Sequence, residues 1–155
     1  MTDMILFCPD FPNGQAVPPQ FTCSGENTSP ALSWSNAPPA TLSFALIADD
    51  PDAPAGVWVH WVLYNIPAAL SNLAPAIEKT ETVPGIGTQG RNDFGRIGYD
   101  GPCPPPGRPH RYYFTLYALD QMLDLMPGLT KKNVLASLQG HILAQAQWMG
   151  TFQRS

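Results

Sequence analysis

The sequence predicts an all-β sandwich in a single domain. Short apolar runs alternate with turn signals over the first 40 residues: ILF at 5–7, QFTC at 20–23 and ALSW at 31–34 are separated by PNG and GEN. Each run has the length of a strand, and no helical period of useful length separates them, which favours a sandwich over alternating β-α-β units. The 18 prolines and 13 glycines fall between apolar runs, which indicates turns and not disorder. A chain of 155 residues suits one substantial core, so we treat 1–155 as one domain.

Composition disfavours several classes of partner. Charged residues form 13% of the chain, about half the usual share, so burial must stabilise the fold more than ion pairs do. The net charge is −4 and lysines and arginines form no cluster, which disfavours nucleic acids and anionic membrane surfaces. The apolar run 4–8 is too short for a signal peptide, and no segment approaches the roughly 20 residues of a membrane helix. We expect a soluble protein of the cytoplasm.

A buried strand followed by carboxylates is predicted near the middle of the chain. Residues 42–48, LSFALIA, are almost continuously apolar, which indicates a central strand covered on both faces. The strand ends in DDPDAP at 49–54, where Asp50 and Asp52 share parity and could face one way. An acidic turn in solvent is the alternative. The bond before Pro54 is a candidate for the cis form.

The next segment, VWVHWVLYNIP at 57–67, is the most strand-like in the chain. Period-two alternation places four side chains on one face: Trp58, His60, Val62 and Tyr64. A lone histidine among apolar neighbours is usually structural. A carboxylate partner would favour a functional role, and Asp50 and Asp52 lie one short turn upstream.

A stiff loop precedes another strand at 98–119, GYDGPCPPPGRPHRYYFTLYAL. Its five prolines fix φ and remove backbone donors, so the loop should hold one shape without a ligand. In the strand that follows, His110 and Tyr112 point to one face, and Arg111 and Tyr113 to the other. The loop therefore delivers an imidazole and a phenol side by side.

The remaining segments carry fewer signals. Trp34 is expected in the core, and residues 68–97 are expected to form a long loop with at most one short strand. Arg91 and Arg96 are expected to lie at the surface or to brace loops. From Thr130, a plausible N-cap, apolar residues recur at helical spacing, with His141 on the packed face and a closing strand at 148–154.

The three cysteines, Cys8, Cys23 and Cys103, form no CxxC pair. We expect small semi-buried side chains in a reducing compartment, with one disulfide and a spare thiol as the alternative.

Convergence of these strand ends would create a site. Two imidazoles and a phenol would donate hydrogen bonds, the loop 101–106 would supply a backbone edge, and Asp50 would orient a histidine and favour its charged form. Such donors suit a phosphate or carboxylate group. Two His and two Asp could instead hold a divalent metal, but the HxH, HExxH and Cys/His spacings of metal sites are absent. Nucleophilic catalysis would need a GxSxG motif or a signature around Cys103, and neither is present. We therefore expect no metal and no cofactor.

Several long stretches resemble the phosphatidylethanolamine-binding protein family, in its bacterial and archaeal branch, often called Raf kinase inhibitor-like. The stretches are DPDAP at 50–54, WVHWVLYNIP at 58–67 and 98–119, supported by 21–34, 92–95 and 140–152. The resemblance implies a sandwich of two antiparallel sheets with few helices and a small anion pocket at one end. The pocket residues that it implies are Asp50, Asp52, His60, Gly101, His110 and Tyr112, supported by Pro51, Pro54, Trp58, Pro102 and Arg111. It also implies a cis bond at Pro54 and allows a second one near Gly56 and Val57.

The resemblance implies binding and not catalysis. Family members bind phosphate-like groups, including the phosphorylethanolamine head group, and are described as phospholipid binders and as inhibitors of kinases or proteases. Cys103 stands where animal relatives carry proline, and the C-terminal helix that borders their pocket is missing after 148–154, so we expect a small phosphorylated compound more than a bilayer lipid. The alternatives are an inhibitor of a kinase or protease that uses the pocket edge, and a hydrolase that depends on His60. A homodimer is left open.

Overall fold

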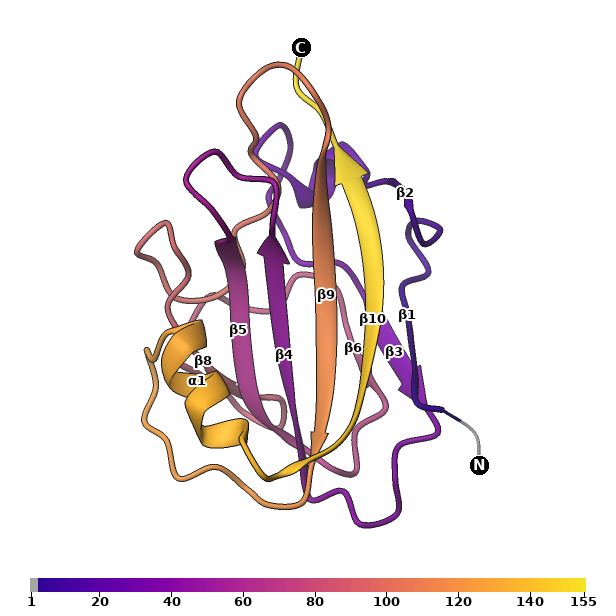
Figure 1. Cartoon of the computed structure of the whole chain (residues 1–155), viewed down its shortest axis with the longest axis vertical. Coiled ribbons are helices and arrows are strands. Elements are labelled where there is room, and N and C mark those ends of the chain that lie inside the picture. Colours follow the sequence, from indigo (N-terminus) through magenta and orange to yellow (C-terminus); the bar gives the residue numbers. More distant parts are fainter. Residues whose placement is uncertain (1–2) are drawn as a thin grey trace.

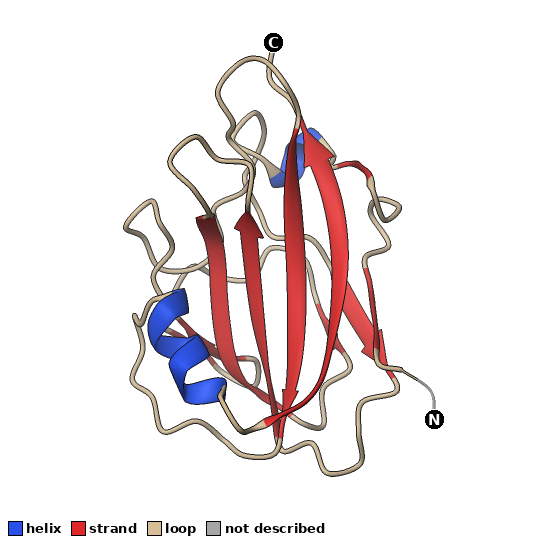
Figure 2. Cartoon of the chain, viewed as in Figure 1, coloured by secondary structure: helices blue, strands red, loops and turns tan. Residues whose placement is uncertain are grey.

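Two β-sheets face each other in the computed structural model, which describes residues 3–155 (Figures 1 and 2). The large sheet has seven strands, in the order β2 (Gln15–Ala16), β10 (Ile142–Phe152), β9 (His110–Leu119), β4 (Ser43–Asp50), β5 (Trp58–Pro67), β8 (Gly87–Gln89) and β7 (Thr82–Val83). The small sheet has three, in the order β1 (Ile5–Phe7), β3 (Leu32–Ser35) and β6 (Asn72–Leu73). All pairs are antiparallel except β2 with β10. The predicted mainly-β sandwich is confirmed.

The core lies on both faces of the large sheet, as predicted for its central strand. One face packs against the small sheet, where Trp34 is 6% exposed and donates from Nε1 to the Leu70 carbonyl at 3.1 Å. The other face is covered by the helix α1 (Lys131–Leu138), which buries Val134 and Leu138 over β4 and β5 (Figure 1). No helix in the described part of the chain is long and apolar enough to cross a membrane.

The helix begins as predicted but ends earlier. Thr130 is the N-cap, and its hydroxyl accepts from the Asn133 backbone N–H at 3.3 Å. The helix stops at Leu138 because Gly140 takes a φ of +81°, which reverses the chain into β10. His141 therefore lies in the turn, half-buried, with Nδ1 2.8 Å from Asp120 Oδ1, and not on a packed helix face. The closing strand is longer than the predicted 148–154.

A β-bulge in β5 changes the predicted face of its side chains. Ala48 pairs with Trp61, whereas Asp49 pairs with Val59, so His60 is an extra residue on β5. Beyond the bulge Trp61 and Leu63 face the small sheet, and Val62 and Tyr64 face α1. The prediction that Trp58, His60, Val62 and Tyr64 share a face was wrong, because it assumed an uninterrupted ladder.

The segment 68–97 holds three short strands, β6, β7 and β8, where at most one was predicted. They were missed because strands of two or three residues are too short for alternation to show. Between β8 and the next long strand, Arg91 donates to the Gly95 carbonyl at 2.8 Å and so braces its loop, as predicted.

Cys23 and Cys103 form a disulfide, with Cα atoms 5.3 Å apart and a sequence separation of 80. The expectation of three reduced cysteines was wrong, and the alternative of one disulfide with a spare thiol is confirmed. The two loops are also joined by the Cys23 N–H, which donates to the Pro102 carbonyl at 3.0 Å. Cys8 is the free cysteine among the described residues, and burial raises the pKa of its thiol to about 11, which keeps it unreactive.

No peptide bond in residues 3–155 is cis, so the expected cis bond at Pro54 was wrong, and the second one that the resemblance allowed near Gly56 and Val57 does not occur there. The turn after β4 closes without one. Gly56 takes a φ of +112° and donates its N–H to the Ala53 carbonyl at 3.0 Å, which reverses the chain between β4 and β5.

Candidate functional site

A pocket of about 240 Å³ lies where β4 ends and β5 and β9 begin, at the upper end of the large sheet in Figure 1. Because neighbouring strands are antiparallel, the end of β4 and the starts of β5 and β9 meet at one edge. Four polar side chains reach the pocket from these strands: Asp50, His60, His110 and Tyr112. Its apolar walls are Trp58, Phe94, residues 53–55 and residues 103–105. The predicted convergence of three strand ends is thus confirmed.

Asp50 and His110 form a close pair within this pocket. His110 Nδ1 lies 2.7 Å from Asp50 Oδ2, and both side chains are largely buried. The other carboxylate oxygen accepts from the Asp52 backbone N–H at 2.7 Å. Because a carboxylate only accepts hydrogen bonds, Nδ1 of His110 carries a proton, and Nε2 is left for a ligand.

His60 is held in one tautomer by the backbone. Its Nδ1 lies 2.6 Å from the Asp100 carbonyl oxygen, which can only accept, so Nδ1 carries a proton. Burial lowers the pKa of His60, although the nearby carboxylates act to raise it, and the lowered pKa favours the neutral ring. The ring packs edge-on against Phe94 and Tyr112, with centroids 5.5 and 5.3 Å away. His60 therefore presents an unprotonated Nε2, an acceptor, where the sequence analysis expected a donor.

The Tyr112 hydroxyl is buried and has no hydrogen-bond partner among the described residues. Burial raises the pKa of this phenol, and the Asp50 carboxylate raises it further, so the hydroxyl stays protonated. Its ring lies nearly parallel to that of His110, at 21° and 6.5 Å between centroids. A buried hydroxyl without a partner is rare in proteins and points to a group that a ligand or water would satisfy.

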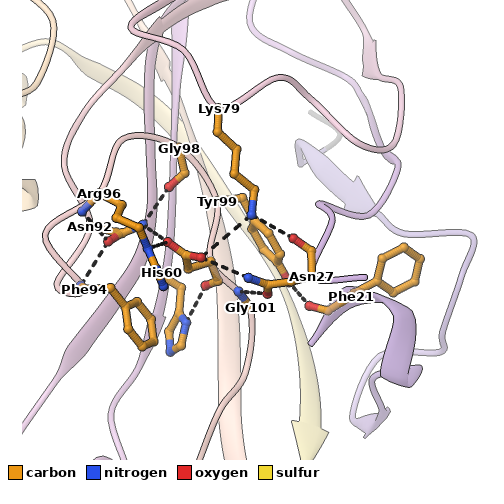
Figure 3. A network of polar contacts seen from close by, with 11 residues as sticks. Phe21, Asn27, His60, Lys79, Asn92, Phe94, Arg96, Gly98, Tyr99 and Gly101 are labelled. Carbon is orange, nitrogen blue, oxygen red and sulfur yellow. Dashed lines mark hydrogen bonds and ion pairs between the residues drawn. The ribbon is translucent and has the colours of Figure 1, made fainter. Parts of the chain in front are cut away.

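Behind His60 lies a network centred on Asp100, a buried carboxylate that sequence reasoning missed (Figure 3). Asp100 accepts from Asn27 Nδ2 at 2.9 Å, from Asn92 Nδ2 at 2.8 Å and from Arg96 Nε at 3.0 Å, and Lys79 Nζ lies 3.7 Å away. The predicted bracing role of Arg96 is confirmed. Since the carbonyl of the same residue fixes His60, the network sets the back wall of the pocket.

Asp52 and Arg111 lie outside the pocket, although both were predicted to belong to it. After Asp50 the chain turns, and the Asp52 carboxylate accepts from Arg111 Nη2 at 2.8 Å and Nε at 2.9 Å on the outer surface. These hydrogen bonds lower the pKa of Asp52 to about 2. Pro51 also lies on that surface, beside Arg111 and Tyr113. Asp52 donates its backbone N–H to Asp50, and it lines the outer depression that His110 also lines.

Gly101 and Pro102 shape the pocket without lining it. The Gly101 N–H donates to Asn27 Oδ1 at 2.7 Å, and the Pro102 carbonyl accepts from Cys23. Pro54 and Trp58, by contrast, line the pocket as predicted, and so do Pro104 and Pro105. The proline-rich loop (residues 101–109) thus forms a wall, held by the disulfide and by Arg154 Nε, which donates to the Pro104 carbonyl at 2.6 Å.

Gly101→Ala is expected to unfold the chain at a lower temperature and to weaken any ligand at the pocket. A Cβ at this position would overlap the Phe21 carbonyl and crowd the Tyr99 hydroxyl, so the backbone would have to move. Circular dichroism melts measure the effect, with Gly107→Ala as a control because its Cβ would meet open space, although its φ of +136° adds some strain. Equal losses in the two variants would contradict the packing explanation.

No cluster of three or more His, Cys, Asp or Glu that could hold a metal ion occurs in residues 3–155.

The sequence matches the family model described as "Phosphatidylethanolamine-binding protein" over residues 8–153. Among curated relatives, a "UPF0098 protein" of Methanothermobacter thermautotrophicus is 49% identical over 138 residues, which cover 89% of this chain and 91% of that protein. Another from Aquifex aeolicus is 46% identical over 153 residues, which cover 97% and 89%.

Two solved structures share the fold over nearly the whole chain. One is described as a putative phosphatidylethanolamine-binding protein homolog, CT736, of Chlamydia trachomatis; it has a TM-score of 0.90 and 40% identity, with 99% of each chain covered. The other is YbcL of Escherichia coli, described as a member of the mammalian PEBP family; it has a TM-score of 0.92 and 32% identity, covering 99% of this chain and 100% of that one.

Proposed function

Because the chain belongs to the phosphatidylethanolamine-binding protein family, we propose that it is a non-enzymatic binding protein whose pocket takes a small ligand with a phosphoryl or carboxylate group. The observation that carries the proposal is the buried Tyr112 hydroxyl, which lacks a partner among the described residues. Leaving such a group unsatisfied costs about 1–3 kcal/mol, which an oxygen of a bound ligand would recover.

Pocket size and walls favour a head group over a whole lipid. A volume of about 240 Å³ is below the range of roughly 300–1,000 Å³ typical of pockets for drug-sized ligands. Trp58 and Phe94 give an aromatic wall, with ring centroids 5.4 Å apart, and Asp50 supplies a negative charge. An aromatic wall beside a carboxylate suits an ammonium group, so phosphorylethanolamine is the ligand that we propose first.

The chemistry of the lining residues supports binding more than catalysis. Cys103 lines the pocket but its sulfur is bonded to Cys23, so it offers no thiolate. No serine or threonine stands among the described lining residues. The described lining residues therefore offer no hydroxyl or thiolate nucleophile of the serine, threonine or cysteine type. Inhibition of a kinase or protease through the pocket edge stays a prediction from the family resemblance alone.

Titration with phosphorylethanolamine tests the proposal. We expect saturable binding by calorimetry and NMR, and a loss of at least about tenfold in affinity in His110→Ala, because truncation removes a ring that contacts the ligand and leaves Asp50 unpaired. His141→Ala is the matched control: its Nδ1 also lies 2.8 Å from a carboxylate, Asp120, but at the opposite end of the β9–β10 pair. Absence of binding to the unaltered protein, or equal affinities of the unaltered protein and His110→Ala, would contradict the proposal.

A further inference from the structure

The pocket offers an anionic ligand very little positive charge. Asp50 is the one carboxylate among its described lining residues, and none of these residues is a lysine or an arginine. With neutral histidines, the ammonium group of phosphorylethanolamine would balance only one of the three negative charges that its phosphoryl dianion and Asp50 bring together. Charges of the same sign repel strongly in a partly buried site, so the pocket as it stands is unsuited to a dianion.

The arginines around the pocket do not supply the missing charge. Arg111 is engaged by Asp52, with Nη2 2.8 Å from Oδ1. Arg154 donates from Nε to the Pro104 carbonyl, behind the loop wall. Arg108 is exposed and, with Asp52, His110 and Arg111, lines a depression on the outer side of the site, but it is not among the described residues that line the pocket. Among the described lining residues, the two histidines are the side chains that can carry a positive charge.

Hydrogen-bonding capacity leads to the same conclusion. The single ring proton of a neutral His60 is donated to the Asp100 carbonyl, and that of a neutral His110 to Asp50. In that state both Nε2 atoms are acceptors, and neither has a hydrogen-bond partner among the described residues. The Tyr112 hydroxyl is then the buried donor without a partner, whereas a phosphoryl dianion carries acceptors alone.

Resting on the proposed function, we infer that a phosphoryl ligand binds only when His110 is doubly protonated, so that binding at neutral and alkaline pH takes up about one proton from solution. The proton attaches to Nε2 of His110, which turns an acceptor into a charged donor to a phosphoryl oxygen. Nδ1 keeps its hydrogen bond to Asp50. In the complex, Asp50 and the His110 imidazolium form an ion pair, and Nε2 of His110 donates a second charge-assisted hydrogen bond to the ligand.

His110 is the histidine placed to accept this proton. The groups that face it are Asp50 and Asp52 from the end of β4 and the turn after it, Tyr112 and Arg111 from its own strand, and Arg108 from the loop. Of these the Asp50 carboxylate makes the closest contact, 2.7 Å, and stabilises an imidazolium, while Arg111 is neutralised by Asp52.

His60 faces a different environment. Its Nδ1 bonds to a neutral carbonyl, and the carboxylates of Asp50, Asp100 and Asp49 act on it from further away. Burial outweighs these charges and lowers the pKa of His60, so the ring stays neutral and accepts from the ligand. An ammonium or hydroxyl hydrogen of the ligand is the group that its Nε2 would bind.

The sign of the pH dependence follows from linkage. The complex holds one proton more than the free protein and the free dianion, so affinity falls as pH rises above the pKa values of both groups. Imidazole ordinarily titrates near a pKa of about 6.5, and a phosphoryl monoester has a second pKa of about 6. Well above both values, the affinity should fall about tenfold for each unit of pH.

Calorimetry with phosphorylethanolamine in two buffers of different ionisation enthalpy counts the protons. We expect an uptake of about one proton near pH 8 and clearly less near pH 5.5. Nitrogen-15 NMR of the imidazole side chains gives a second readout: at about pH 8 both ring nitrogens of His110 should become protonated on binding. In His110→Gln, which cannot titrate, the remaining binding should lose its pH dependence, whereas His141→Gln should keep it.

The outcomes separate this inference from the proposed function. Absence of phosphorylethanolamine binding at any pH would overturn both. Binding with no proton uptake near pH 8, a singly protonated His110 in the complex, or an unchanged pH slope in His110→Gln would overturn the inference and leave the binding function standing.

Discussion

Asp100→Ala should lower the free energy of unfolding by about 1–3 kcal/mol, because it removes a buried acceptor that several donors share. The Asp100 side chain is 5% exposed, and Asn27, Asn92 and Arg96 all donate to it. Without the carboxylate, the amide of Asn92, itself buried, keeps only the Gly98 carbonyl as an acceptor. Urea unfolding followed by circular dichroism measures the difference.

Asp120→Ala is the matched control for this substitution. Asp120 also accepts from a side chain, His141, but lies at the surface, so its loss should change the unfolding free energy by no more than about 0.5 kcal/mol. If Asp100→Ala does not fold, Asp100→Asn supplies a milder variant that keeps one acceptor oxygen. Similar urea midpoints for Asp100→Asn, Asp120→Ala and the unaltered chain would contradict the stabilising role of the network.

Loss of the Cys23–Cys103 disulfide should cost about 2–4 kcal/mol of stability and also weaken ligand binding. The bond joins positions 80 residues apart, so it restricts the unfolded chain strongly. Cys103 and Pro104 line the pocket, so the same bond also holds one of its walls. We expect the double variant Cys23→Ser/Cys103→Ser to unfold at a lower urea concentration and to bind phosphorylethanolamine less tightly.

Reductant provides the internal control for the disulfide. It should shift the urea midpoint of the unaltered chain toward that of the double variant and leave the double variant unchanged. An unchanged midpoint in a chain whose bond has been shown by mass spectrometry to be reduced would disprove the stabilising role. The cytoplasmic location stays a prediction, and the disulfide bears on it because reducing compartments rarely maintain such bonds.

The architecture could be predicted where local sequence decides it. The apolar run 42–48 predicted the buried β4, and Trp34 was correctly assigned to the core. The end of α1 could have been predicted as well, since Gly140 has the C-terminal signature of a helix, but the spacing of later apolar residues favoured a longer helix. The disulfide could not be predicted, because it depends on two loops that meet only in the folded chain.

The site was predicted where side chains lie at strand ends. Asp50, His60, His110 and Tyr112 follow from the apolar runs beside them and from the family resemblance. Asp52 was misplaced because parity along a strand does not extend into the turn that follows it. Asp100 was missed because its partners come from loops without any periodic pattern.

The bulge in β5 divides the strand into a part that packs in the core and a part that lines the pocket. Residues 61–67 are constrained by the volumes that fill the two layers of core, whereas Trp58 and His60 are constrained by what the pocket holds. A regular ladder would have turned the imidazole toward α1 and a valine toward the ligand. One inserted residue thus separates the part of the strand that maintains the fold from the part that contacts the ligand. Substitutions in one part can therefore occur without changing the other part.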